Sequence, residues 1–190
     1  MSYRLVIFDM DGTLTRPYLD FPKIREALGL PEPLLESLQA LPPGPGRERA
    51  FALLSEFEHE AAQASELNEG AREILELLPR RGVASALVTR NSRRSVRTVT
   101  EKHALHFDTV VTREDAPAKP RPEPLWLICG RLAVPPAQAL MVGDHEMDVQ
   151  AGRNAGMHAA LITNGDKPGD LDRIAPDHVF ETPAGLLRLF

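Results

Sequence analysis

Short apolar runs that alternate with helical patterns constrain this 190-residue chain more than any other feature. An apolar run of four to eight residues that ends in a turn signal is typical of a buried strand. Such runs occupy residues 4–9, 84–89, 108–112, 139–143 and 158–163, with a weaker one at 178–180. Helical patterns lie between them at 71–81, 92–103, 122–132 and 146–154. This alternation predicts an α/β fold, with a three-layer, doubly wound parallel sheet of the Rossmann type as its core.

The segment from residue 17 to residue 69 breaks the alternation. It shows helical patterns only, at 22–28, 33–40 and 48–64, and three prolines in Leu41–Gly46 enforce an irregular connection before the last of them. We therefore expect a small all-helical cap inserted after the first strand. The predicted core consists of residues 1–16 and 70–190, and the predicted cap of residues 17–69.

Composition and charge narrow the classes of partner. The chain carries 27 acidic and 22 basic side chains, a net charge of −5, and its bases are scattered, which argues against nucleic acid. No stretch approaches the ~20 apolar residues of a membrane span, and the first ten residues do not resemble a signal peptide. A single cysteine, Cys129, fits a reducing cytoplasm. A small phosphorylated metabolite remains open as the partner, and a monomer and a homodimer both remain open.

Two carboxylates follow the first predicted strand, in the sequence Asp9-Met10-Asp11-Gly12. Because Gly12 permits a tight turn, Asp9 and Asp11 can converge on one reacting centre. One of them is then placed to attack phosphorus, while the other protonates the leaving oxygen and later activates water. The alternative is that the pair merely ends a strand at a common Asp-Gly turn.

A second acidic segment follows the run at 139–143. Asp144 and Asp148 lie four residues apart at a predicted helix start, and their oxygen atoms suit a hard cation. The alternative is that acids at this position complement the helix macrodipole, which explains part of the role of Glu146.

Two further segments carry groups that bind a phosphoryl group. Thr89, Arg90 and Asn91 offer a hydroxyl and backbone N–H donors, and Lys119 in a proline-rich loop offers a positive charge. Taken alone, the Thr89–Asn91 segment could be a capping turn at a helix start, and Lys119 could be a solvated side chain. All four segments, however, fall at the predicted carboxyl ends of parallel strands or in the loops beyond, where sites form in such sheets. We therefore predict that they meet around one divalent ion.

Taken in order, these segments resemble the haloacid dehalogenase superfamily. The closest resemblance is to its branch with a helical cap after the first strand, which includes phosphoglycolate phosphatases and β-phosphoglucomutases. It runs from Arg4 to about Thr163 and is carried by the segments Asp9–Thr15, Phe107–Asp115, Lys119–Pro124 and Met141–Asp148 and by the Ala-Gly pairs at 151–152 and 155–156. The resemblance implies a Mg²⁺-dependent phosphatase that forms an aspartyl-phosphate.

The resemblance also implies roles for individual residues. Asp9 is the implied nucleophile and Asp11 the implied general acid and base. The implied phosphoryl-binding residues are Thr89, Arg90 through its amide, Asn91 and Lys119. The implied Mg²⁺ ligands are the Asp9 carboxylate, the Asp11 carbonyl and Asp144, with Asp148 as a further ligand or an orienting group. His145 departs from the family pattern, and we interpret it as a loop residue that touches the site only indirectly.

Several related functions are weighed against a phosphatase. Asp11 stands where true dehalogenases lack an acid, and Lys23 is the only lysine clearly in the cap, which disfavours the phosphonate-cleaving members. A β-phosphoglucomutase-like phosphomutase stays open, as does a catalytically silent regulatory or binding protein with this fold. By resemblance, 2-phosphoglycolate is the first candidate substrate. Its carboxylate would bind a base of the cap, with the candidates Arg16, Lys23, Arg25, Arg47 and Arg49.

Overall fold

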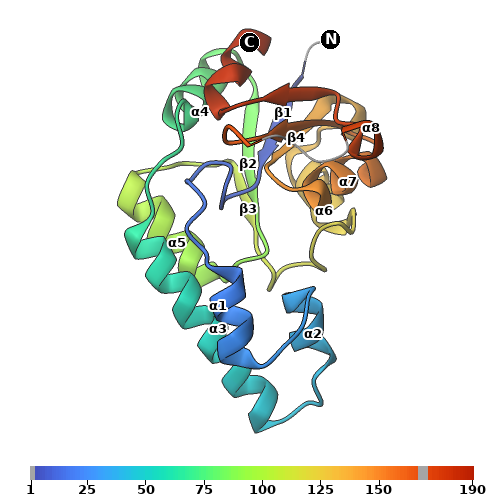
Figure 1. Cartoon of the computed structure of the whole chain (residues 1–190). Coiled ribbons are helices and arrows are strands. Elements are labelled where there is room, and N and C mark those ends of the chain that lie inside the picture. Colours follow the sequence, from blue (N-terminus) through green and yellow to red (C-terminus); the bar gives the residue numbers. More distant parts are fainter. Residues whose placement is uncertain (1–2, 167–170) are drawn as a thin grey trace.

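Six parallel strands form the centre of the structure (Figure 1). The computed structural model describes residues 3–166 and 171–190. The strand order across the sheet is β3-β2-β1-β4-β5-β6, and every neighbouring pair is parallel. The strands are β1 (Leu5–Phe8), β2 (Ala84–Val88), β3 (Thr109–Val111), β4 (Ala139–Gly143), β5 (His158–Ile162) and β6 (His178–Phe180). The predicted α/β fold class is confirmed.

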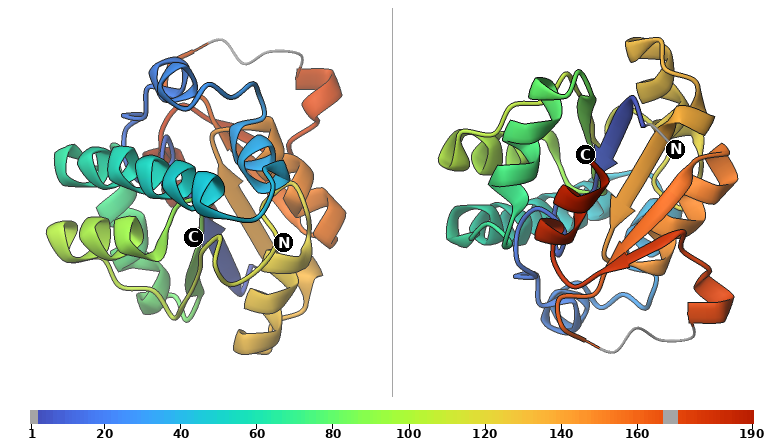
Figure 2. Two further views of the ribbon diagram at one scale, coloured as in Figure 1. Left: turned by 90° about the horizontal axis from the view of Figure 1, so that it is seen from below. Right: turned by 90° about the horizontal axis from the view of Figure 1, so that it is seen from above.

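Helices cover both faces of the sheet and give three layers (Figure 2). Buried side chains of α4, α5 and η2 pack on one face, and those of α6 and α7 pack on the other. These helices and their shorter neighbours are α4 (Ala71–Arg80), α5 (Arg93–His103), α6 (Glu123–Leu132), η1 (Pro136–Gln138), α7 (Glu146–Ala155), α8 (Leu171–Ile174) and η2 (Pro183–Leu189). Within residues 3–166 and 171–190, no helix has the length and apolar character that a membrane span requires.

The central strand β1 is buried on both sides. Successive side chains of a strand point to opposite faces, so Val6 and Phe8 join one apolar cluster while Leu5 and Ile7 join the other. Burial on both faces explains why this strand is a continuous apolar run instead of an alternating one. Burial of a large apolar side chain contributes about 1.5–3 kcal/mol. The residue that follows β1 is therefore held on a rigid support.

The chain between β1 and α4 forms three helices, α1 (Phe21–Leu28), α2 (Leu34–Ala40) and α3 (Pro45–Ala64). We call residues 17–69 the helical insertion. Figure 1 shows its helices below the sheet. It has an apolar cluster of its own, centred on the buried side chains Ile24, Leu34, Leu38 and Leu54. Its longest helix, α3, also packs along α5 of the core.

Some details differ from the sequence pattern. Helix α3 begins at Pro45, whereas the apolar pattern predicts a start at residue 48. Proline suits the first helical position because its missing N–H has no partner there and its φ is already helical. The pattern also missed η2, because short 3₁₀ turns lack the 3.6-residue period that reveals a longer helix.

Gly70, at the start of α4, permits close packing against η2 near the end of the chain. Gly70 has φ +79°, and a Cβ at this position would lie 2.3 Å from the Ala184 backbone in η2. We expect Gly70→Ala to lower the free energy of unfolding by about 2–4 kcal/mol, through backbone strain and overpacking together. Gly46 is the matched control, because it lies within α3 and a Cβ added there would enter open space.

We expect Gly46→Ala to raise the free energy of unfolding by about 0.5 kcal/mol, since alanine favours a helix over glycine. Urea denaturation of both variants measures the two changes. Equal effects from the two substitutions would contradict the packing of η2 against α4.

Candidate active site

The strand order places the site between β1 and β4. The chain moves outward from β1 through β2 to β3 and then returns to β4 on the other side of β1. At such a switch point the loops that follow the two central strands diverge and leave a crevice. Asp9 directly follows β1, and Asp144 directly follows β4. The Asp9 amide donates a hydrogen bond of 2.8 Å to the Val142 carbonyl, which extends the pairing of the two strands up to the crevice.

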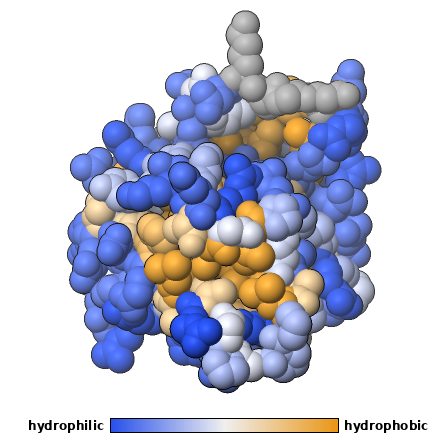
Figure 3. Space-filling view, turned by 60° about the horizontal axis from the view of Figure 1, so that its bottom comes forward, coloured by the Kyte–Doolittle hydropathy of each residue, from blue (hydrophilic) through white to orange (hydrophobic). Residues whose placement is uncertain are grey.

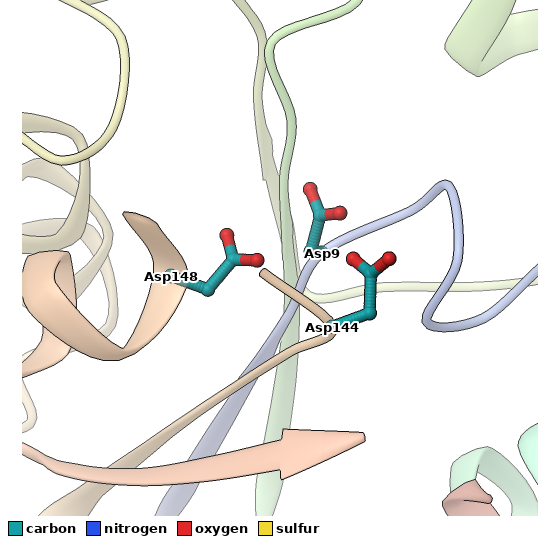
Figure 4. A group of neighbouring side chains, drawn as sticks. All are labelled: Asp9, Asp144 and Asp148. Atoms are coloured by element: carbon teal, nitrogen blue, oxygen red, sulfur yellow. The ribbon is translucent and has the colours of Figure 1, made fainter. Parts of the chain in front are cut away.

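Three carboxylates meet in this crevice (Figure 4). One oxygen from each of Asp9, Asp144 and Asp148 lies within 4.8 Å of the other two. Asp9 and Asp144 extend from strand ends, and Asp148 extends from the first turn of α7. The two acidic segments that the sequence singled out therefore lie together, although Asp9 and Asp144 are far apart in the sequence.

Two glycines make room for these carboxylates. A Cβ at Gly12, whose φ is +77°, would lie 2.0 Å from Asp144 Oδ2. A Cβ at Gly143 would lie 2.2 Å from the Cβ and Cγ atoms of Asp148. Both distances are far inside van der Waals contact, so a side chain at either position displaces a carboxylate.

Lys119 is the cation among the acids. Its side chain is 2% exposed, and Nζ lies 2.5 Å from Asp9 Oδ1 and 2.6 Å from Asp148 Oδ1. Burial alone lowers the pKa of Lys119, but the charges of Asp148 and Asp9 outweigh it, so the pKa is raised and the ammonium group stays charged. Lys119 is therefore not the solvated side chain that the sequence alone allowed.

Negative charge exceeds positive charge at this point. Burial raises the pKa of Asp9 to about 7, against the opposing effect of Lys119. Burial and the nearby carboxylates of Asp9 and Asp148 raise the pKa of Asp144 to about 8. One buried ammonium group does not balance three acids, so this arrangement favours the binding of protons or of a second cation.

Asp11 is held by the segment that follows β2. The side-chain Nδ2 of Asn91 donates to Asp11 Oδ2 at 2.5 Å, and the backbone N–H of Asn91 donates to Thr89 Oγ1 at 3.1 Å. Burial raises the pKa of Asp11, although the hydrogen bond from Asn91 opposes this, and the net shift favours the protonated acid. Ser92, and not Asn91, caps α5 through its side chain. The turn at Thr89 thus also positions a partner for Asp11.

Two asparagines that the sequence analysis did not select hold the loop after β1. Asn68 Nδ2 donates to the Thr13 carbonyl at 3.2 Å and to Asn164 Oδ1 at 2.6 Å. Asn164 Nδ2 donates to the Gly12 carbonyl at 2.7 Å. No motif marks either asparagine. Asn164 nevertheless lies just beyond a predicted strand, and the strand-end rule that selected Asp9 would also have found it.

His145 and Asp148 form the start of α7. Asp148 Oδ2 accepts a hydrogen bond of 3.0 Å from the His145 amide, and His145 Nδ1 accepts one of 3.1 Å from the Met147 amide. This capping box satisfies N–H groups that a helix start leaves without partners. Asp148 therefore uses one oxygen for the helix and the other for Lys119. Its clearest role in the structure is to orient the lysine.

Several ion pairs join the core to the helical insertion, and none was predicted; two of them, Arg90–Glu36 and Arg113–Glu58, each include a residue that lines the site. Arg90 Nη2 donates to both carboxylate oxygens of Glu36 on α2, at 2.9 and 2.7 Å, and its Nη1 donates to the Lys119 carbonyl at 2.8 Å. Arg113 pairs with Glu58 on α3, and these side chains are 8% and 3% exposed. Acids on helices are usually solvated, so nothing in the sequence distinguishes the two glutamates.

A pocket of about 540 Å³ lies between the acids and the helical insertion. It includes all residues that the sequence selected for chemistry: Asp9, Asp11, Thr89, Arg90, Asn91, Lys119, Asp144 and Asp148. Arg25 also lines it. The other four bases weighed as substrate ligands are not among the described residues that line this pocket: Arg16, Lys23, Arg47 and Arg49.

The fold and this constellation can be compared with known proteins. The model of the haloacid dehalogenase-like hydrolase family matches residues 24–162, which is most of the chain. The chain belongs to this family. The family resemblance read from the sequence motifs is therefore confirmed.

Relatives of this family member include named phosphatases. It is 33% identical to an uncharacterized hydrolase of Saccharomyces cerevisiae over 85% of this chain and 78% of that protein. It is 30% identical to the N-acetylmuramic acid 6-phosphate phosphatase of Pseudomonas putida, over 87% and 85% of the two chains. It is 34% identical to the phosphoglycolate phosphatase of Mannheimia succiniciproducens, over 66% of this chain and 58% of that protein. The crystal structure of a hydrolase from Pseudomonas syringae shares the fold, with a TM-score of 0.81 at 21% identity, covering 100% of this chain and 97% of that one.

The acids of this family member fit a divalent cation. The donors are carboxylate oxygens, which Mg²⁺ and similar hard cations prefer, and they lie within 4.8 Å of one another. Burial, with a smaller contribution from neighbouring carboxylates, raises the pKa values of Asp9 and Asp144, and a bound cation would favour their ionised forms. The cluster is therefore able to bind a metal ion.

This charge imbalance predicts that stability depends on pH and on Mg²⁺. Without the ion, we expect stability to fall as the pH rises from about 4 to about 8, because folded Asp9 and Asp144 keep protons that the unfolded chain releases near pH 4. Mg²⁺ requires deprotonated ligands, so its effect grows over the same range. At pH 8, we expect Mg²⁺ at 100 times its Kd to stabilise the folded chain by about 2.7 kcal/mol and to raise Tm by about 5–10 °C.

Asp144→Asn tests the origin of this effect. We expect it to raise Tm in EDTA at pH 8, because it removes one of the repelling charges, and to abolish the Mg²⁺ increment. Asp172→Asn, on the exposed face of α8, is the control and leaves both values unchanged. Thermal melts at pH 5.5 and pH 8 measure both variants. If Mg²⁺ raised the Tm of Asp144→Asn as much as that of the native protein, the ion would bind elsewhere.

Proposed function

We propose that this chain is a Mg²⁺-dependent phosphatase that hydrolyses a small phosphate monoester through an aspartyl-phosphate on Asp9. One observation supports the proposal above the others: buried Lys119 and the carboxylates of Asp9, Asp144 and Asp148 converge on one face of a pocket that also contains Asp11. Named phosphatases among the relatives are a second support.

In the first step, a carboxylate oxygen of Asp9 attacks phosphorus and the bond to the leaving oxygen breaks. Asp11, whose pKa is raised by burial, donates its proton to that oxygen. Thr89 and the amides of Arg90 and Asn91 bind the phosphoryl oxygens. Lys119 stabilises the negative charge that Asp9 and the phosphoryl group share.

In the second step, water attacks the phosphorus of the aspartyl-phosphate, and Asp11, now deprotonated, accepts the proton from that water. The bond between phosphorus and the Asp9 oxygen breaks, which releases inorganic phosphate and restores the Asp9 carboxylate. Asn91 keeps the Asp11 carboxylate in place through both steps. Asp9, the Asp11 carbonyl and Asp144, with Asp148 behind them, are the residues that would hold Mg²⁺. When bound, the ion offsets the negative charge that otherwise keeps an anionic ester away from an anionic carboxylate.

The helical insertion, residues 17–69, serves as the cap in this proposal, because its three helices contribute to the pocket opposite the acids. The partner is a small phosphorylated metabolite and not nucleic acid or a membrane, in keeping with the net charge of −5 and a pocket of about 540 Å³. A cytoplasmic location agrees with the buried free thiol of Cys129.

Hydrolysis is favoured over phosphoryl transfer between sugar positions. A phosphomutase must hold a sugar bisphosphate through its hydroxyl groups, which requires polar side chains on the cap. Most residues that the helical insertion contributes to the pocket are apolar. A catalytically silent protein is disfavoured because Asp9, Asp11 and Lys119 are all present, with Lys119 paired to Asp9 and Asn91 hydrogen-bonded to Asp11.

Two substitutions separate the two steps. With p-nitrophenyl phosphate, we expect Asp9→Asn to abolish release of p-nitrophenolate, because the nucleophile is lost. Asp11→Asn should instead give a burst of p-nitrophenolate equal to the enzyme concentration and then slow turnover, about 10²–10⁴-fold below the native rate. The burst forms because this leaving group departs without an acid, whereas hydrolysis of the aspartyl-phosphate still needs the base.

Stopped-flow absorbance measures the burst, and mass spectrometry of the quenched protein locates the phosphate on Asp9. Asp172→Asn is the matched control and retains native turnover. EDTA should abolish steady-state turnover of p-nitrophenyl phosphate by the native protein. Turnover that survives in Asp9→Asn rejects the mechanism.

A further inference from the structure

The pocket has two chemically different walls. The core contributes the polar and charged residues described above, whereas the helical insertion contributes mostly apolar side chains. Figure 3 shows apolar residues gathered on the face of the molecule where the insertion lies, with hydrophilic residues around them. The apolar residues of the insertion that line the pocket are Leu19, Phe21, Pro33, Leu34, Leu35 and Leu54.

Three charged residues interrupt this apolar wall, and one of them is already fully engaged. Glu58 is 3% exposed, pairs with Arg113 and accepts a hydrogen bond of 3.2 Å from the Ser92 amide. It therefore fixes the insertion to the core instead of facing a ligand. The remaining two, Arg25 and Glu32, pair with each other. The Arg25 side chain is 26% exposed and that of Glu32 is 73% exposed.

Arg25 is thus the partly buried cation of this wall. A guanidinium group has five N–H donors, and a single carboxylate uses at most two of them in a bidentate pair. The exposed Glu32 therefore leaves Arg25 able to bind a further anion. Arg25 belongs to α1, on the insertion, whereas Lys119 and the acids belong to the core. The lining of one pocket thus combines a phosphoryl site on the core with apolar side chains and a cation on the insertion.

We propose that the leaving group of the substrate is an alcohol with an apolar body, alkyl or aromatic, and an anionic group at its far end that binds Arg25. This inference rests on the proposed phosphatase function and names its substrate class. The pocket volume of about 540 Å³ lies in the range that accepts drug-sized ligands, about 300–1,000 Å³. Glycolate, a two-carbon acid, is too small to cover such an apolar wall.

An unsubstituted sugar is disfavoured for a different reason. Its hydroxyl groups would lie against leucine and phenylalanine side chains that offer no hydrogen-bond partner, and a polar group buried in this way is penalised. Two phosphate esters with the same number of atoms are therefore discriminated by the polarity of the leaving group. The wall favours the less polar one.

Three esters with the same reactive end test this inference: propyl phosphate, 3-phenylpropyl phosphate and 3-(4-carboxyphenyl)propyl phosphate. Their leaving oxygens are chemically alike because the propyl chain insulates them from the ring, so differences in kcat/KM report contacts in the pocket. We expect kcat/KM to rise about tenfold with the ring and about tenfold again with the carboxylate. 2-Phosphoglycolate should rank with propyl phosphate.

Two variants locate the contacts. Phe21→Ala, at a half-exposed position that tolerates truncation, should remove most of the gain from the ring. Arg25→Gln should remove only the gain from the carboxylate, through a higher KM at constant kcat. Lys23→Gln is the matched control, since Lys23 is an exposed base of the same helix outside the pocket lining. It should change none of the three values.

Binding of the same esters to Asp9→Asn, measured by calorimetry, separates this inference from the proposed function. The same order of affinities supports the apolar substrate class even if the native protein hydrolyses none of the esters, an outcome that would overturn the phosphatase proposal alone. Equal affinities and equal kcat/KM values for the three esters, or a preference for 2-phosphoglycolate, overturn the inference.

Discussion

One buried ammonium group organises this site. Lys119 holds Asp9 and Asp148 at 2.5 and 2.6 Å, and Asp144 lies close enough to join the same cluster. Ionised groups are stable in a protein interior only when paired, and here the pairing is incomplete. The result is a concentration of negative charge that the fold tolerates but does not neutralise. Such unrelieved charge is usual where a protein binds a cation or stabilises a reaction.

The sheet makes this arrangement mechanically possible. The reversal of strand order between β1 and β4 brings two strand ends side by side, and each end delivers one acid. Gly12 and Gly143 then permit contacts that no other residue would allow. Hydrogen bonds from Asn68 and Asn164 fix the loop that follows β1. Stability from the apolar core thus supports a cluster that is itself unfavourable.

The sequence predicted the core better than the contacts around it. Continuous apolar runs revealed the central strands, because strands buried on both faces leave a strong pattern, whereas the partly exposed edge strand β6 left a weaker one. The strand-end rule selected Asp9, Thr89 and Asp144. The partners Glu36 and Glu58 escaped prediction, since their role depends on how the helical insertion rests against the core, and helix patterns do not encode that packing. The capping box of His145 and Asp148 was likewise hidden, because the backbone geometry decides which oxygen faces Lys119.

The two walls of the pocket also differ in how freely their residues can be substituted. Every group that the proposed chemistry uses extends from a strand end, from the loops beyond it or from the first turn of α7, whereas the apolar wall comes from α1, α2 and α3 and their connections. Residues on those helices can therefore change during evolution without disturbing the acids. A lineage that keeps the same core can acquire new substrates by repacking one small helical segment, and phosphatases with nearly identical centres can diverge widely in what they accept.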